Sequence, residues 1–373
     1  MARARVRGPS LGKAETPHLF APLHSFLESR IAAGLVPGAV FVAGRSDGAV
    51  HRAALGQRAL KPRVEPMTAQ TIFDLASLTK PMATAALVVE RASAGGLDLD
   101  DPLERHLEET RGTEAGSVKL SMLLTHTGGF PPMNPIEDYR GGKTRLYDAI
   151  ARESLEARPG ERFTYSDVGY MLLQGAIERR LGKTLDRAAQ ERIFTPLRFR
   201  DTRFGTRAKD LARVAPTTRE GGRWLRGRVH DPRARSRALG GVAGNAGMFG
   251  TAEEVARFCE MLLRGGMYGS RRILSRETVR LMTTNQCGAS LGVRRGFGFD
   301  IESPYSAPRG TIFSGDSYGH SGFTGVSMWI DPRNDAYFVL LTNSVHAGGH
   351  KDLKAFRSEA ATFAARGLGI AGG

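Results

Sequence analysis

The order of hydrophobic periodicities along the chain constrains its fold most strongly. β-prone runs occur near both ends, at 39–43 and 49–55 and again at 326–330 and 336–342, and helical spacing dominates between them. Each pair of runs flanks a short turn, at 46–48 and at 331–334, so each pair is a predicted hairpin. This order predicts an antiparallel sheet built from both termini, flanked by terminal helices, with an all-helical lobe inserted between them.

We therefore expect an α/β (α+β) fold. Residues 1–76 and 231–373 are predicted to form a discontinuous sandwich lobe and residues 77–230 a mainly helical lobe, together one domain. A chain of 373 residues is long enough to bury a sizeable core in this way. Helices are predicted at 22–34, from 77 to about 124 with a break at 98–102, at 168–181, at 185–193, from the capping box at 251–254 to 263, and at the C-terminus up to 367.

The net charge of +15 raises the possibility of nucleic-acid binding. The densest basic runs, at 1–13 and 219–237, contain one aromatic residue between them, Trp224, and no recognisable nucleic-acid motif. We interpret the charge as a solvated basic surface and expect no nucleic-acid partner.

Targeting and metal signals are weak. The N-terminus is basic but has no apolar stretch of about 7–15 residues, so it is a poor signal peptide, and the longest apolar run, at 82–89, is too short to span a bilayer. We expect a cytoplasmic protein without a membrane span; a different true start would allow a periplasmic location. Cys259 and Cys287 cannot form a disulfide framework or a zinc site alone, so no metal is expected, and the oligomeric state is not determined.

Ser77 and Lys80 stand where an apolar helical pattern begins. A spacing of three places both side chains on one helix face, so the Lys80 amine can reach the Ser77 hydroxyl. A serine needs a neighbouring group to take its proton, and a lysine can do so if burial or another cation lowers its pKa. Taken alone, the pair also fits a helix start with a solvated lysine.

Two further motifs contain candidate site residues. Tyr165 and Asp167 follow a turn and precede an apolar helix, which presents the phenol at a loop–helix junction. His320, Ser321 and Gly322 lie on a strand that leads into the last hairpin, where Gly322 would admit a substrate backbone. In isolation the tyrosine also fits a core position, and the histidine an edge strand.

Taken in order, Ser-x-x-Lys at 77–80, Tyr-Ser-Asp at 165–167 and His-Ser-Gly at 320–322 resemble the three motifs of the serine β-lactamase and penicillin-binding-protein superfamily, in particular its class C-like branch of esterases and D-peptidases. The resemblance implies a site between the two lobes and no cofactor. It implies Ser77 as the nucleophile, Lys80 as its base and Tyr165 as the proton shuttle. The backbone amides of Ser77 and Phe323 would form the oxyanion hole.

Two departures from that pattern bear on the substrate. Asp167 stands where the β-lactamases usually have asparagine, and an ionised carboxylate cannot donate to an amide carbonyl. His320 stands where they usually have lysine, which weakens carboxylate anchoring unless Arg294 or Arg295 compensates. We expect a serine hydrolase acting on small esters, amides or short D-amino-acid peptides, with weak or no β-lactamase activity.

Alternative interpretations remain at this stage. The chain could be a non-catalytic protein that binds cell-wall fragments, or a genuine class C-type β-lactamase. His126 is interpreted as pinning loop backbone, and His230 and Asp231 as a structural or pocket-wall element rather than part of a Ser-His-Asp triad. The loops at 133–143 and 286–295 are expected to shape the acyl pocket.

Overall fold

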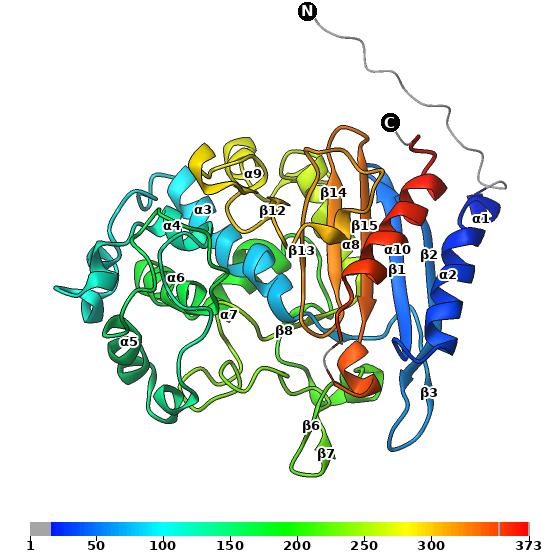
Figure 1. Ribbon diagram of the computed structural model, residues 1–373, viewed down its shortest axis with the longest axis horizontal. Coiled ribbons are helices and arrows are strands. Elements are labelled where there is room, and N and C mark those ends of the chain that lie inside the picture. The colour runs from blue at the N-terminus through cyan, green and yellow to red at the C-terminus, as the bar shows by residue number, and fades with distance from the viewer. Residues whose placement is uncertain (1–15, 350, 372–373) are drawn as a thin grey trace, which may run out of the picture.

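The computed structural model describes residues 16–349 and 351–371, so the basic run at 1–13 lies outside the described residues. An eight-stranded antiparallel sheet forms the centre of one half of the molecule (Figure 1). Its order is β11 (Arg294–Arg295), β12 (Asp300–Glu302), β13 (Tyr318–Ser321), β14 (Ser327–Asp331), β15 (Ala336–Thr342), β1 (Gly38–Arg45), β2 (Gly48–Ala59) and β3 (Glu65–Pro66). Both predicted hairpins are confirmed, and pairing of β1 with β15 joins the two ends of the chain, as expected for the fold class.

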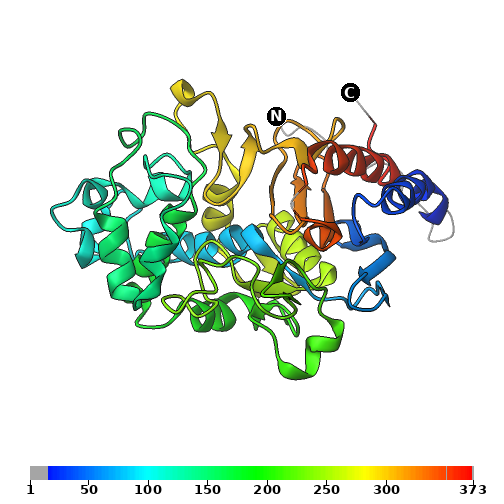
Figure 2. The same cartoon turned by 60° about the horizontal axis from the view of Figure 1, so that its bottom comes forward.

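Helices cover both faces of this sheet. Helices α2 (Ala21–Ala32) and α10 (Lys354–Gly367), preceded by the short α1 (Thr16–Leu19), lie on one face, and α8 (Ala252–Leu263) lies on the other (Figures 1 and 2). Strand β1 shows why its sequence is continuously apolar: Phe41 packs in the cluster with α2 and α10, whereas Val40 and Val42 pack in the larger core. A strand buried on both faces has no solvent-facing positions for polar side chains.

The remaining helices lie mainly at the other end of the molecule (Figure 1). They are α3 (Ala86–Ser93), α4 (Leu120–Leu124), α5 (Lys143–Ala151), α6 (Asp167–Leu181), α7 (Leu185–Ala189) and α9 (Arg276–Thr283). A three-stranded sheet joins β4 (Phe73–Asp74) and β5 (Arg203–Phe204) to the central β8 (Met248–Gly250), and two small hairpins comprise β6 (Arg219–Glu220) with β7 (Arg223–Trp224) and β9 (Met267–Tyr268) with β10 (Arg271–Arg272). The division of the chain at residues 76 and 230 stays a prediction.

The helices predicted from Ser77 to about residue 124, with a break at 98–102, are only partly observed. The chain makes a 3₁₀ turn at Ala76–Leu78, a π-helical segment at Lys80–Ala85 and then α3, which already ends at Ser93. Gly95, with φ of +70°, follows the end of this helix, before the acidic break that the sequence suggested. Three short 3₁₀ segments, at Leu103–Arg105, Glu108–Thr110 and Glu114–Ser117, interrupt the irregular chain from there to α4.

The capping box predicted at the start of α8 is only half formed. The Thr251 hydroxyl accepts from the Glu254 amide, as an N-cap does. The Glu254 carboxylate does not return to the cap; it accepts the backbone N–H groups of Arg200, Asp201 and Thr202. The buried carboxylate therefore ties α8 to the segment that leads into β5.

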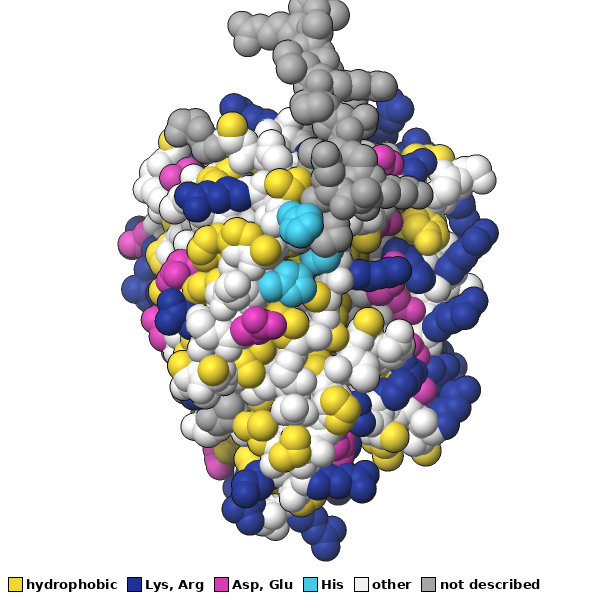
Figure 3. Space-filling model, turned by 90° about the vertical axis from the view of Figure 1, so that its right-hand side faces the viewer, with side chains coloured by type: hydrophobic (Ala, Val, Ile, Leu, Met, Phe, Trp, Pro, Cys, Tyr) yellow, Lys and Arg dark blue, Asp and Glu magenta, His cyan; other side chains and the backbone are white. Residues whose placement is uncertain are grey.

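Charged side chains are dispersed over the surface. On the face that carries α1 and α2, Lys and Arg side chains lie mostly toward the edges, with hydrophobic and uncharged groups between them (Figure 3). Part of the basic run at 219–237 is neutralised, since Arg226 contacts Glu65 at 2.9 Å and Arg235 contacts Glu220. Within the described ranges, none of the helices combines the length and apolar character needed to cross a bilayer.

Candidate active site

The proposed nucleophile and its lysine are brought into hydrogen-bonding contact. Ser77 lies on the 3₁₀ turn directly after β4, and Lys80 begins the π-helical segment. Residues three apart eclipse one another in a 3₁₀ turn, and Lys80 Nζ lies 3.0 Å from Ser77 Oγ. Lys80 also donates to the Asn245 carbonyl at 3.2 Å, so the glycine-rich loop at 240–247 fixes the amine from the other side.

Lys80 is fully buried, and its charge state differs from the one the sequence suggested. Burial disfavours the ammonium, but the Asp167 carboxylate, 2.6 Å from Nζ, and the Tyr165 phenol outweigh burial and raise the Lys80 pKa. The condition stated for a lysine base, that burial or another cation lowers its pKa, is therefore not met by Lys80 beside Asp167. Lys80 rests as a cation, paired with a side chain that the sequence had assigned to substrate binding.

Tyr165 lies next to this cation. Lys80 Nζ is 4.9 Å from the centroid of the Tyr165 ring, and both Tyr165 and Ser77 line one cavity. The His126 ring packs on the Tyr165 ring with centroids 4.4 Å apart, and His126 Nδ1 accepts the Ser166 amide at 3.1 Å. His126 therefore pins the backbone that carries the tyrosine, as the sequence indicated.

His320 and Ser321 line the same cavity from the end of β13. Burial, together with the nearby charge of Lys80, lowers the pKa of His320 well below its usual value. A neutral ring whose Nδ1 lies 2.8 Å from the Ser321 carbonyl donates there, which leaves Nε2 as an acceptor. His320 therefore cannot replace a permanent cation.

Gly322 has a packing role that the sequence did not indicate. A Cβ at this position would lie 2.5 Å from Val326 Cγ2 and 3.0 Å from both Ala76 Cβ and the Leu75 carbonyl oxygen. The missing side chain is therefore required for close packing of the strand end against the turn before Ser77, and because Gly322 also lines the cavity, its predicted contact with a substrate backbone stays a prediction.

The cavity in front of Ser77 has a volume of about 500 Å³. All the predicted site residues except the buried Lys80 line it, and its further walls include Tyr305, Ala307, Pro308, Leu353 and Arg357. The loop at 133–143 contributes no lining residue, and the loop at 286–295 contributes only Arg295. The sequence missed the segments at 305–308 and 351–357 because only the tertiary fold brings them to the site.

Arg294 is paired with carboxylates outside the cavity lining, whereas Arg295 lines the cavity. Arg294 pairs with Asp316 at 3.1 Å and with Glu302 at 3.4 Å. Arg295 pairs with Asp300 through Nη1 at 3.1 Å, while its buried Nε and Nη2 atoms have no hydrogen-bond partner among the described residues. The contacts of Arg294 do not support compensation for the missing lysine, and compensation by Arg295 stays a prediction.

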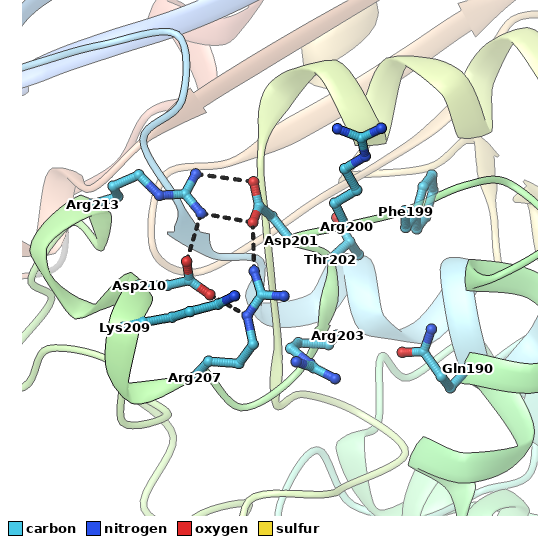
Figure 4. Close-up of a pocket in the computed structure, with 10 residues that line it drawn as sticks. All are labelled: Gln190, Phe199, Arg200, Asp201, Thr202, Arg203, Arg207, Lys209, Asp210 and Arg213. Carbon is cyan, nitrogen blue, oxygen red and sulfur yellow. Dashed lines mark hydrogen bonds and ion pairs between the residues drawn. The ribbon is translucent and has the colours of Figure 1, made fainter.

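A second cavity, of about 560 Å³, contains none of the predicted site residues (Figure 4). Its walls carry an ion-pair network in which Arg213 binds both Asp201 and Asp210, and Arg207 binds the same two carboxylates. Arg200 points away from that network. Among the residues that the structure describes, no group of three or more His, Cys, Asp or Glu side chains is placed to hold a metal ion.

The molecule combines a sheet that is covered by helices on both faces with an adjoining helical half, and serine, lysine and tyrosine meet at one cavity. This combination defines a serine hydrolase of the penicillin-recognising kind. The β-lactamase family model matches residues 23–362, and the chain belongs to that family. An Escherichia coli (strain K12) protein named as a candidate D-alanyl-D-alanine carboxypeptidase is 34% identical over 309 residues, covering 75% of this chain and 70% of the relative. The N-acetylmuramyl-L-alanine amidase of Bacillus subtilis (strain 168) is 28% identical, covering 91% and 85%.

Solved structures agree on the fold. EstCE1, a hydrolase with promiscuous acyltransferase activity, superposes with a TM-score of 0.76 at 23% identity, covering 93% of this chain and 99% of its own. The octameric penicillin-binding protein homologue from Pyrococcus abyssi gives a TM-score of 0.71 at 24% identity, covering 93% and 77%. The predicted family, fold class and hydrolase activity are thereby confirmed.

Proposed function

We propose that this hydrolase forms an acyl-enzyme at Ser77 and cleaves small esters, amides or short D-amino-acid peptides in preference to β-lactams. The observation that carries the proposal is the 3.0 Å contact between Ser77 Oγ and the buried Lys80 Nζ at a cavity that Tyr165 also lines. A non-catalytic binding protein would have no need to bury a lysine beside a serine, since burial of the cation is costly.

Lys80 and Tyr165 act as one acid–base pair in this scheme. When the pair has lost one proton, it accepts the Ser77 proton as Oγ attacks the substrate carbonyl carbon, and it returns that proton to the leaving alcohol or amine as the acyl–oxygen or acyl–nitrogen bond breaks. The amides of Ser77 and Phe323 would stabilise the tetrahedral oxyanion. A water molecule then attacks the acyl-enzyme, giving up its proton to the same pair, which returns it to Ser77.

The substrate preference rests on the charges at the cavity. Asp167 is committed to Lys80 at 2.6 Å, so it offers no donor to an amide carbonyl. His320 is neutral, so the position that usually holds a permanent lysine cation cannot anchor a β-lactam carboxylate by charge. Apolar walls such as Pro308 and Leu353 accommodate the apolar part of an acyl group, beside charged lining residues such as Lys354.

Intact-mass labelling tests the nucleophile. Wild type and Ser77→Ala are each treated with a fluorophosphonate and with benzylpenicillin, and p-nitrophenyl butyrate and nitrocefin turnover are compared. We expect the fluorophosphonate adduct in wild type only, with ester turnover faster than nitrocefin turnover. Labelling of the alanine variant would exclude Ser77 as the nucleophile, and faster nitrocefin turnover would overturn the substrate preference.

A further inference from the structure

A buried aspartate next to the active site connects the turn that carries Ser77 with the turn that carries Phe323. Asp74, at the end of β4, is 1% exposed. Its Oδ1 accepts the Ala76 amide at 2.9 Å, and its Oδ2 accepts both the backbone amide of His230, at 2.8 Å, and His230 Nδ1, at 3.0 Å.

The first element that Asp74 holds is the nucleophile turn, residues 74–77. Ala76 has a φ of +46°, which is unfavourable for a residue with a side chain, and persists only where neighbouring contacts enforce it. The bond from the Ala76 amide to Asp74 is such a contact. Because Ala76 directly precedes Ser77, this bond fixes the direction in which the Ser77 amide and hydroxyl leave the turn.

The second element is the oxyanion turn, residues 322–326. The carbonyl of Asp74 accepts the Thr324 hydroxyl at 2.8 Å, and the His230 ring stacks on the Phe323 ring with centroids 5.4 Å apart and planes at 10°. On the other side of the oxyanion turn, Arg357 Nη2 donates to the carbonyls of Gly322, at 2.7 Å, and Val326, at 3.3 Å. Because Arg357 fixes that side of the oxyanion turn, Asp74 and His230 set the separation between the oxyanion turn and the nucleophile turn.

We infer that Asp74 and His230 are positioning residues that hold the Ser77 and Phe323 amides in register as one oxyanion hole. The inference rests on the proposed function, in which those two amides bind the oxyanion. His230 does not line the cavity, and its side chain is 8% exposed, so it acts through Phe323 rather than on the substrate. Asp74 raises the pKa of His230 against the opposing effect of burial, which keeps the Nδ1 proton directed at the carboxylate.

Two variants test this pair, with two matched controls. Asp74→Asn removes an acceptor from His230, and His230→Phe keeps the ring stack but loses the bond to Asp74. A second, partly buried His–Asp pair, His106 with Asp101, has the same 3.0 Å separation and lies outside the cavity, so His106→Phe and Asp101→Asn are the controls. The assays are kcat and KM for p-nitrophenyl butyrate, inhibition by phenylboronic acid, whose adduct imitates the tetrahedral intermediate, and the Tm.

Loss of one oxyanion donor costs about 10²–10³ in kcat, and a displaced donor costs less. We expect kcat to fall about 10- to 100-fold in Asp74→Asn and about 3- to 10-fold in His230→Phe, with KM within about twofold, because only transition-state binding is weakened. Phenylboronic acid should bind more weakly by the same factor as kcat/KM. The controls should lower the Tm without changing kcat or boronate affinity.

Unchanged kcat and boronate affinity in both variants, with an active wild type, would overturn the inference and leave the proposed function intact. So would a loss confined to KM. If Asp74→Asn does not fold, the kcat and the boronate affinity of His230→Phe alone decide whether the inference holds. A wild type that neither turns over the ester nor is labelled at Ser77 would overturn the proposed function and, with it, this inference.

Discussion

Replacement of Asp167 by asparagine tests the charge balance of the active site most directly. The carboxylate lies 2.6 Å from Lys80 Nζ, and the two side chains are 24% and 0% exposed. At that distance the attraction between unit charges is about 6 kcal/mol at an effective dielectric constant of about 20, and about 1.6 kcal/mol in bulk water. Since about 1.4 kcal/mol corresponds to one pKa unit, loss of the carboxylate should lower the pKa of the Lys80–Tyr165 pair by about 1 to 5 units.

The assay is the pH dependence of kcat/KM for p-nitrophenyl butyrate between pH 5 and 10. The rate rises with pH as the base loses its proton, which gives the pH profile an ascending limb. In Asp167→Asn this ascending limb should move to lower pH by at least about one unit. The shift has the same sign whether Lys80 or Tyr165 is the base, because removal of a nearby negative charge favours deprotonation of both. Asparagine can also donate to an amide carbonyl, so nitrocefin turnover should rise relative to ester turnover.

A matched control is Glu178→Gln, which removes a similarly half-buried carboxylate, 2.8 Å from Lys143 Nζ, outside the active-site cavity. That variant should leave the limb where it is in wild type. A limb that stays in place in Asp167→Asn would show that the Asp167 charge does not control the base, and would refute the reasoning.

Further predictions concern charge, proton uptake and packing. Lys80→Met should lower kcat for the ester by at least about 100-fold while the protein stays folded, since it removes a group that transfers the Ser77 proton; retained activity would contradict the role of Lys80. The folded-state pKa of His320 lies well below that of an unfolded chain, so only the unfolded state gains a proton below about pH 6.5, and stability should fall there by up to about 1.4 kcal/mol per pH unit. Urea unfolding at pH 5 and 7.5 should show a smaller difference in His320→Phe than in wild type; an equal difference would contradict this. Gly244→Ala would place a Cβ 1.9 Å from the Tyr170 carbonyl oxygen, so it should destabilise by about 1–3 kcal/mol or more, whereas Gly142→Ala, with open space at its Cβ, should change the Tm little.

Local sequence patterns predicted the sheet hairpins, most helices and the three motifs at the active site. Strand and helix periodicities are local, so β1, β14 and α6 could be recognised from short windows. A spacing of three is also local, and it placed Lys80 beside Ser77 even though the predicted α-helix proved to be a 3₁₀ turn followed by a π-helical segment. The neutral state of His320 likewise followed from its residue type.

Only the tertiary structure decided the charge of Lys80, the partners of Glu254 and the role of Gly322. Each depends on atoms that are far apart in the sequence: Asp167 lies 87 positions after Lys80 and sets its pKa, and the three amides that bind Glu254 come from more than 50 positions before it. Asp74 and His230 are separated by 156 positions, and no periodicity or motif spacing links them. Coulombic and hydrogen-bonding effects depend on distance in space, so the folded chain, and not the order of its residues, determines them.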